Sequence, residues 1–344
     1  MANDQHLLPN ESHLEYKKRV LDTKSNSFCG AKWYYATIWL YSGMTTSCHH
    51  PLPHLVSVDE VSKNYKSLSN TPQKKLERTM MQKGERPTGC DYCWRVEDLG
   101  PEQVSDRVYK SILYNDKDLQ IAYEDTEQKD FNLKYLELSF DRTCNFSCSY
   151  CNPSFSSSWV KDIKTHGPYT NLGQDANNHY GHQHNNIKID EEDNPYIDAF
   201  FKWWESDLHK TLTHLRLTGG EPLMSKHTWK LLEWFNEKDS DIYFAINSNL
   251  GCKPEIIERL LQYTSKLKNF HVYTSNESVN YTAEYIRDGL DWNLWQKNCE
   301  TLIESKILAG FHSMCTINAV SITGLYRDWE TDRKSTRLNS SHRL

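Results

Sequence analysis

The second half of the chain alternates short apolar runs with longer amphipathic stretches. The apolar runs have strand length and are predicted as strands at Leu133–Phe140, His214–Thr218, Ile242–Asn247, Phe270–Thr274 and Phe311–Ile317. Helical periodicity fills most of the intervals between them, at Pro195–Trp204, Lys226–Asn236, Pro254–Tyr263 and Trp292–Glu304. Strands that alternate with helices in this way predict an α/β fold with a parallel sheet and helices on its outside.

The first part of the chain has a different pattern. Aromatic and β-branched residues surround the turn sequence Tyr41–Met44, which predicts a hairpin between Phe28 and Cys48. Helical patterns follow over residues 58–83 and Gln103–Leu113. A small N-terminal module of mixed structure is therefore expected before the α/β part.

Three segments are predicted along the chain. The charged stretch at Glu124–Asp130 separates an N-terminal module, residues 1–130, from the α/β part, residues 131–331. Residues 332–344 include the string DRKSTRLNSSH, which matches the translation of a common sequencing adapter, so they are interpreted as an artefactual tail. Residues 165–194 are predicted to be a polar surface insertion.

Composition narrows the class of protein. The chain has 344 residues, and its 40 Lys+Arg and 46 Asp+Glu give a formal net charge of -6, which argues against non-specific nucleic-acid binding. No apolar run approaches the roughly 20 residues of a membrane helix. The N-terminus has neither the basic nor the apolar region of a secretion signal, so a cytoplasmic location and metal-binding rather than disulfide-bonded cysteines are expected.

The cysteines of the segment DRTCNFSCSYC carry the strongest chemical signal. Cys144, Cys148 and Cys151 have the spacing CxxxCxxC and directly follow the first predicted strand of the α/β part. Thiolates are the ligands that iron–sulfur clusters prefer. Three of them on a four-iron cluster leave one iron open to a small molecule, whereas a zinc loop is the alternative.

A second motif follows the next strand, where Leu217–Pro222 reads LTGGEP. With both motifs in this order, the chain resembles the radical S-adenosylmethionine (radical SAM) superfamily. The resemblance implies that Cys144, Cys148 and Cys151 hold a [4Fe–4S] cluster and that S-adenosylmethionine binds its open iron. It further implies reductive cleavage to a 5'-deoxyadenosyl radical that abstracts hydrogen from a substrate.

The same resemblance implies roles in binding S-adenosylmethionine. Tyr150 matches the position that packs near the adenine, while Gly219, Gly220 and Glu221 match the segment that receives the methionyl amine. The implied fold is a partial (β/α)6 TIM-like barrel that is truncated at its last strand.

Polar residues at three further strand ends fit this picture, because functional groups gather at the C-terminal ends of barrel strands. Candidate contacts to S-adenosylmethionine are Asn249 after the third strand, Ser275 and Glu277 after the fourth, Arg287, which resembles a family arginine, and Asn318 after the fifth. Each of them also has the alternative interpretation of a helix cap or a surface turn.

Four N-terminal cysteines form a second candidate site. Cys29 and Cys48 bracket the predicted hairpin, and Cys90 and Cys93 form a CxxC loop. The pattern resembles the Twitch module, a short relative of the SPASM domain, which implies an auxiliary [4Fe–4S] cluster; these modules usually follow the barrel, whereas here the cysteines precede it. A structural zinc and no metal are the alternatives, while Cys252, Cys299 and Cys315 are interpreted as small buried apolar residues.

The substrate stays open between a peptide, a protein and a small molecule, and an electron donor such as flavodoxin or ferredoxin is the expected partner. An RNA-modifying enzyme is an alternative that the acidic composition disfavours. A non-enzymatic, zinc-binding interaction protein is another, which leaves the LTGGEP motif unexplained.

Overall fold

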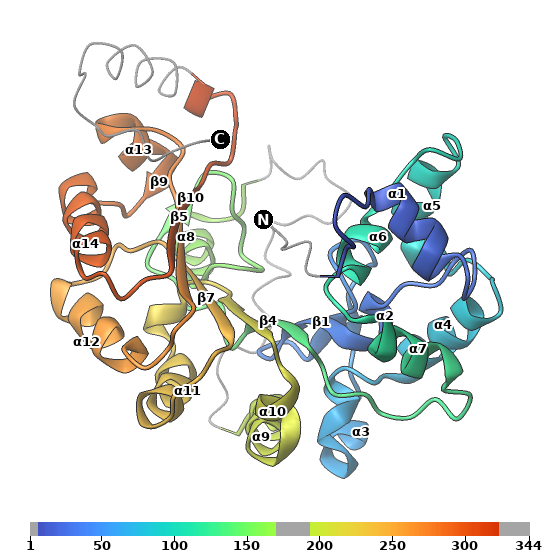
Figure 1. Cartoon of the computed structure of the whole chain (residues 1–344). Coiled ribbons are helices and arrows are strands. Elements are labelled where there is room, and N and C mark those ends of the chain that lie inside the picture. Colours follow the sequence, from blue (N-terminus) through green and yellow to red (C-terminus); the bar gives the residue numbers. More distant parts are fainter. Residues whose placement is uncertain (1–5, 170–192, 323–344) are drawn as a thin grey trace. The chain divides into compact units, whose positions relative to one another are not determined.

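The computed structural model describes residues 6–169 and 193–322, and the chain divides into two compact units (Figure 1). Unit 1 comprises Met1–Leu138 and Glu191–Leu215, and unit 2 comprises Ser139–Asp190 and Arg216–Leu344. The first part of unit 1 extends past the boundary predicted at residue 130, and unit 1 also includes Glu191–Leu215, which the sequence analysis assigned to the α/β part. The predicted artefactual tail and most of the predicted insertion lie outside the described residues.

The predicted hairpin is present in unit 1. Strand β1 (Tyr35–Trp39) pairs antiparallel with β2 (Met44–Thr46), which pairs antiparallel with β3 (His54–Leu55). Gly43 occupies the turn with φ +66°, a conformation that favours glycine. The segment just before the hairpin is helical, because α2 (Ala31–Tyr34) buries its side chains in the core of this unit.

Helices make up most of the rest of unit 1. They are α1 (His13–Tyr16), η1 (Lys17–Leu21), α3 (Val58–Lys63), η2 (Tyr65–Leu68), α4 (Pro72–Gln82), η3 (Thr88–Cys90), α5 (Asp91–Glu97), α6 (Asp106–Ser111), α7 (Asp116–Glu124), α9 (Pro195–Trp203), η6 (Trp204–Leu208) and α10 (His209–Thr211). Helix α4 begins where the Thr71 side chain accepts from the Lys74 N–H and Pro72 occupies the first turn. Four cysteines belong to the apolar core or its edge, together with Phe28, Trp33 and Trp94.

Unit 2 contains the parallel strands that the sequence predicts. Strand β7 (Tyr243–Ser248) pairs parallel with β8 (Phe270–Ser275), and β8 pairs parallel with β10 (Gly310–Met314). Helices α11 (Lys226–Glu237), α12 (Pro254–Thr264) and α14 (Trp292–Glu304) lie along the outer side of these strands (Figure 1). The predicted α/β architecture with parallel strands is confirmed.

The remaining elements include two further strands of the sheet and several short elements. They are β4 (Tyr135–Ser139) and β6 (His214–Thr218), in which the two units divide, β5 (Ser147–Cys148), α8 (Ser157–His166), η7 (Pro222–Met224), α13 (Asn280–Ile286) and β9 (Arg287–Asp288). None of the helices in the described parts of the chain is long and apolar enough to cross a membrane.

Alternation along β8 directs side chains toward the site. Phe270, Val272 and Thr274 are buried, whereas the residues between them are half-buried and face the opposite side. Because β7 and β8 run parallel, with Ser248 opposite Thr274, their C-terminal ends meet at one edge of the sheet.

Candidate functional site

Three cysteines and three strand ends line one cavity in unit 2. The cavity has a volume of about 210 Å³, and its wall includes all three thiols of the CxxxCxxC loop. The rest of the wall comes from the ends of β6, β7 and β8 and from the neighbouring loops, through Phe146, Tyr150, Phe155, Thr218, Gly219, Gly220, Asn247, Ser248, Asn249, Ser275 and Arg287. Five residues that were selected at separate strand ends, Gly219, Gly220, Asn249, Ser275 and Arg287, are thus brought together, whereas Asn318 does not line this cavity.

The start of α8 holds the cysteine loop in place. The Cys144 N–H donates to the Ser157 hydroxyl (3.0 Å), and the Ser158 hydroxyl donates to the Cys144 carbonyl (2.7 Å). The Trp159 indole N–H donates to the Cys148 carbonyl (3.0 Å). These residues were missed in the sequence analysis, although a run of serines directly after a metal-binding loop is the kind of signal that could have indicated them.

A two-stranded pairing fixes the middle of the same loop. Strand β5 pairs antiparallel with β9, which places Cys148 opposite Arg287. Burial raises the pKa of Cys144, Cys148 and Cys151, in the last case to about 11, while the Arg287 charge opposes the shift at Cys148. The thiols are therefore protonated at neutral pH, and a metal that bound them would have to displace these protons.

Two glycines let the chain after β6 approach the cysteine loop. A Cβ on Gly219 (φ +128°) would lie 2.7 Å from the Asp141 carbonyl oxygen, and one on Gly220 would lie 2.3 Å from the Thr143 carbonyl oxygen. Real Cβ atoms do not tolerate such distances, so both positions require glycine. The backbone at this point forms a wall of the cavity.

Replacing Gly220 by alanine is expected to displace the cysteine loop, since the nearest atoms belong to the rigid backbone of Arg142 and Thr143. The expected loss is about 1–3 kcal/mol of unfolding free energy, measured by chemical denaturation. Gly89→Ala is the matched control, because its Cβ would meet only ordinary contacts at 3.4 Å. Equal stabilities of the two variants would contradict the conclusion that position 220 requires glycine.

Glu221 contacts the end of β7. Its buried carboxylate accepts from the Ser248 hydroxyl (2.8 Å) and from the backbone N–H groups of Asn249 (2.6 Å) and Leu223 (3.0 Å). Burial raises the pKa of Glu221, and these hydrogen bonds oppose the rise. In this structure Glu221 therefore positions Ser248 and Asn249, which line the cavity themselves.

Asn249 connects the end of β7 to the cysteine loop. Its side-chain amide donates to the Asn145 side-chain oxygen (2.8 Å), and its amide nitrogen lies 3.9 Å from the Cys144 sulfur. The Glu221 carboxylate, Asn249 and the loop thus form one continuous set of contacts.

Three polar side chains form another part of the site, of which Glu277 and Arg287 are buried and Tyr150 is 36% exposed. The Tyr150 hydroxyl donates to Glu277 Oε1 (2.9 Å), and Arg287 Nη1 lies 3.8 Å from Glu277 Oε2. Arg287 also donates to the Ser275 carbonyl. Burial raises the pKa of Tyr150, so its hydroxyl stays a donor at neutral pH. By contrast, Asn318 lies in the turn after β10, where its side chain accepts from the N–H groups of Val320 and Ser321.

All four N-terminal cysteines line one cavity of unit 1. Cys29 precedes α2, Cys48 follows β2, and Cys90 and Cys93 lie at the start of α5. Burial raises the pKa of each thiol, and for Cys93 the value is about 12. Within the described parts of the chain, no three His, Cys, Asp or Glu side chains stand close enough together to hold a single metal ion.

Basic residues surround these four thiols. Lys32, His50, Arg107 and Lys110 line the same cavity. The His50 ring stacks on Tyr92, with centroids 3.9 Å apart, and its Nε2 lies 2.7 Å from Asp106 Oδ2. His49 contacts the Tyr35 hydroxyl (2.9 Å).

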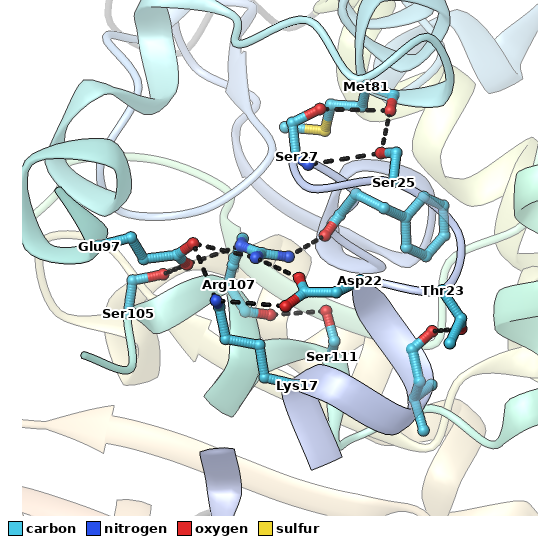
Figure 2. A network of polar contacts seen from close by, with 12 residues as sticks. Lys17, Asp22, Thr23, Ser25, Ser27, Met81, Glu97, Ser105, Arg107 and Ser111 are labelled. Carbon is cyan, nitrogen blue, oxygen red and sulfur yellow. Dashed lines mark hydrogen bonds and ion pairs between the residues drawn. The ribbon is translucent and has the colours of Figure 1, made fainter. Parts of the chain in front are cut away.

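Arg107 is a buried clip between three segments of unit 1 (Figure 2). Its guanidinium donates to both oxygens of Glu97 (2.6 and 2.9 Å) and to Asp22 (2.9 Å). It also donates to the Phe28 carbonyl (2.9 Å), directly before Cys29. The clip therefore positions the segment that carries Cys29.

The three remaining cysteines lie apart from both cavities. Cys299 is buried on α14 and Cys252 is half-buried. Cys315 is exposed, so the interpretation of this residue as a buried apolar side chain is wrong. The physical reason is its place just after β10, where the sheet ends.

Comparison with known proteins gives two kinds of match. A family model described as "Radical SAM superfamily" matches residues 138–331. GTP 3',8-cyclase of Campylobacter lari is 24% identical over 149 residues, which are 43% of this chain and 37% of that protein. GTP 3',8-cyclase of Campylobacter curvus is 27% identical over 143 residues, 42% and 35% of the two chains. The chain thus spans only about a third of these relatives.

Solved structures give weaker similarity. Streptococcus suis SuiB bound to S-adenosylmethionine aligns with a TM-score of 0.37 and 12% identity, over 86% of this chain and 58% of that chain. SuiB bound to the precursor peptide SuiA aligns with a TM-score of 0.37 and 14% identity, over 88% and 60%.

Proposed function

This chain belongs to the radical SAM superfamily, and we propose that Cys144, Cys148 and Cys151 hold the [4Fe–4S] cluster with which that family binds S-adenosylmethionine. The observation that carries the proposal is the shared cavity. Its wall combines the three thiols with the glycine pair and the polar strand ends. When bound, the cluster and S-adenosylmethionine supply an electron transfer and a radical that abstracts hydrogen from the substrate.

The residues present fit both groups. Three thiols provide the ligands of three irons and leave the fourth open. The backbone at Gly219 and Gly220 gives close approach to a ligand, and the Asn249 and Ser275 positions offer polar atoms at the same wall. Membership of an enzyme family contradicts the alternative of a non-enzymatic zinc protein.

Tyr150, Glu277 and Arg287 are proposed to orient S-adenosylmethionine. Tyr150 and Arg287 line the cavity, whereas Glu277 is buried and contacts both of them. The Arg287 cation suits a carboxylate ligand, and the Tyr150 ring offers a flat surface to an adenine. Glu277 holds these two side chains in position.

The substrate is proposed to be polar, with peptides and proteins as the first class to test. Tyr273 and His271 lie on the face of β8 that also presents Ser275 to the cavity. The Tyr273 hydroxyl bonds to the Tyr243 hydroxyl (2.7 Å), and the Arg216 guanidinium lies 4.3 Å from the Tyr273 ring centroid. This face offers hydrogen bonds and aromatic rings rather than an aliphatic surface.

Cys29, Cys48, Cys90 and Cys93 are proposed to hold an auxiliary [4Fe–4S] cluster. Four thiols on one cavity supply a complete ligand set, and the basic residues around it suit a negatively charged cluster. Zinc is the alternative that the test must separate.

Iron and acid-labile sulfide per chain test both sites after anaerobic reconstitution. We expect about eight of each, and about four when alanine replaces Cys144, Cys148 and Cys151. If the unchanged chain holds about four iron and four sulfide, and the variant with three alanines holds none, the auxiliary cluster alone is overturned. Zinc without iron would overturn both assignments.

A further inference from the structure

One basic residue at the four-cysteine cavity differs from the others in burial and in pairing. Arg107 is buried, but two carboxylates balance its charge. Lys110 is only half-buried and lies over the Tyr35 ring, 4.9 Å from its centroid. Lys32 has a side chain that is 2% exposed and a single carboxylate partner, Glu77 Oε2, at 2.6 Å.

Lys32 shares its cavity with the four thiols. Its side chain lines that cavity together with Cys29, Cys48, Cys90 and Cys93. Its ammonium group donates to Glu77 Oε2 at 2.6 Å. The structure therefore places a buried cation at the thiol cavity, with a carboxylate beside it.

A positive charge at Lys32 would have a strong effect on the reduction potential of a cluster buried in this cavity. An iron–sulfur cluster gains one negative charge on reduction, and its potential depends on local charge, on hydrogen bonds to the sulfurs and on exposure to solvent. A cation in a buried site interacts with that charge far more strongly than one in water. A carboxylate on the far side of the cation opposes the effect.

We propose that Lys32 raises the reduction potential of the cluster held by Cys29, Cys48, Cys90 and Cys93, and that Glu77 limits that rise. The proposal rests on the assignment of these cysteines to a cluster. Lys32 and Glu77 act here through their charges, which change the stability of the reduced cluster. Neither residue is proposed to contact a substrate.

A redox titration in the full chain tests the proposal. Alanine at Cys144, Cys148 and Cys151 leaves the N-terminal cluster as the sole signal, and electron paramagnetic resonance follows its reduction by dithionite. At the midpoint potential of this parent chain, Lys32→Gln is expected to lower the ratio of reduced to oxidised cluster at least tenfold, which is about 59 mV for one electron.

Two further variants make the result specific to charge. Glu77→Gln is expected to raise the same ratio, because it removes the carboxylate and leaves the Lys32 charge. Lys110→Gln, the matched control on the same cavity, is expected to change it less than threefold, because solvent screens a half-buried charge.

The outcomes separate the two proposals. A parent chain with zinc or no iron overturns the auxiliary cluster, and the role of Lys32 with it. A parent chain with about four irons, in which Lys32→Gln and Glu77→Gln fail to shift the potential in opposite directions, overturns the role of Lys32 alone. If the Lys32→Gln variant binds no cluster, the Glu77→Gln variant becomes the test. An unchanged or lowered reduction potential of its cluster overturns the proposal.

Discussion

Replacing Cys144 by alanine is expected to lower reductive cleavage of S-adenosylmethionine by more than about 100-fold, since even outer-shell changes at metal sites cost up to this factor. Cys144 lines the cavity, and its backbone is tied to Ser157 and Ser158 at the start of α8. The loss should appear in the yield of 5'-deoxyadenosine under dithionite, measured by chromatography.

The matched control is Cys315→Ala, because Cys315 is exposed and lies outside both thiol cavities. Its yield should equal that of the unchanged chain. A Cys144→Ala variant that still cleaves S-adenosylmethionine at the control rate would show that the cavity in unit 2 is not the site of the reaction.

Replacing Arg107 by leucine is expected to destabilise unit 1 by about 3–5 kcal/mol, because Glu97 and Asp22 are then left to share one cation, Lys17 (Figure 2). The side chain of Arg107 is 1% exposed, so solvent cannot replace the lost contacts. Chemical denaturation of the metal-free chain, followed by tryptophan fluorescence, measures the change.

Arg95→Leu is the control for this prediction. Arg95 pairs with Asp91 four residues earlier on α5, and its side chain is 80% exposed. A surface pair of this kind contributes less than about 1 kcal/mol. An Arg107 variant that loses no more stability than the Arg95 variant would contradict the role of Arg107 as a clip.

The strands and helices of the second half could be predicted because local pattern determines them. Strand β6 was predicted with its observed bounds, and β7 and β8 within one residue at each end. Each is an apolar run that the fold buries against helices. Helix α7 was missed, since its polar sequence becomes helical through its cap Asn115 and the burial of Leu119.

The candidate site could be predicted only in part. Cysteine spacing selected Cys144, Cys148 and Cys151 and the pair Cys90 and Cys93, because ligands on one loop are close in sequence, whereas Cys29 and Cys48 were selected because they bracket the hairpin. The contacts around them join distant segments: Arg107 to Asp22, Lys32 to Glu77, and Glu221 to Ser248. No local sequence pattern predicts such pairs. The role of Arg107 and the basic residues at the N-terminal cavity were therefore identified only from the structure.

Binding of S-adenosylmethionine at the proposed cluster of Cys144, Cys148 and Cys151 can be measured by electron paramagnetic resonance of the reduced chain. Alanine at Cys29, Cys48, Cys90 and Cys93 ensures that only this cluster contributes. Adding S-adenosylmethionine is expected to change the spectrum, because the ligand occupies the open iron. A reduced four-iron spectrum that is identical with and without S-adenosylmethionine would contradict binding at this cluster.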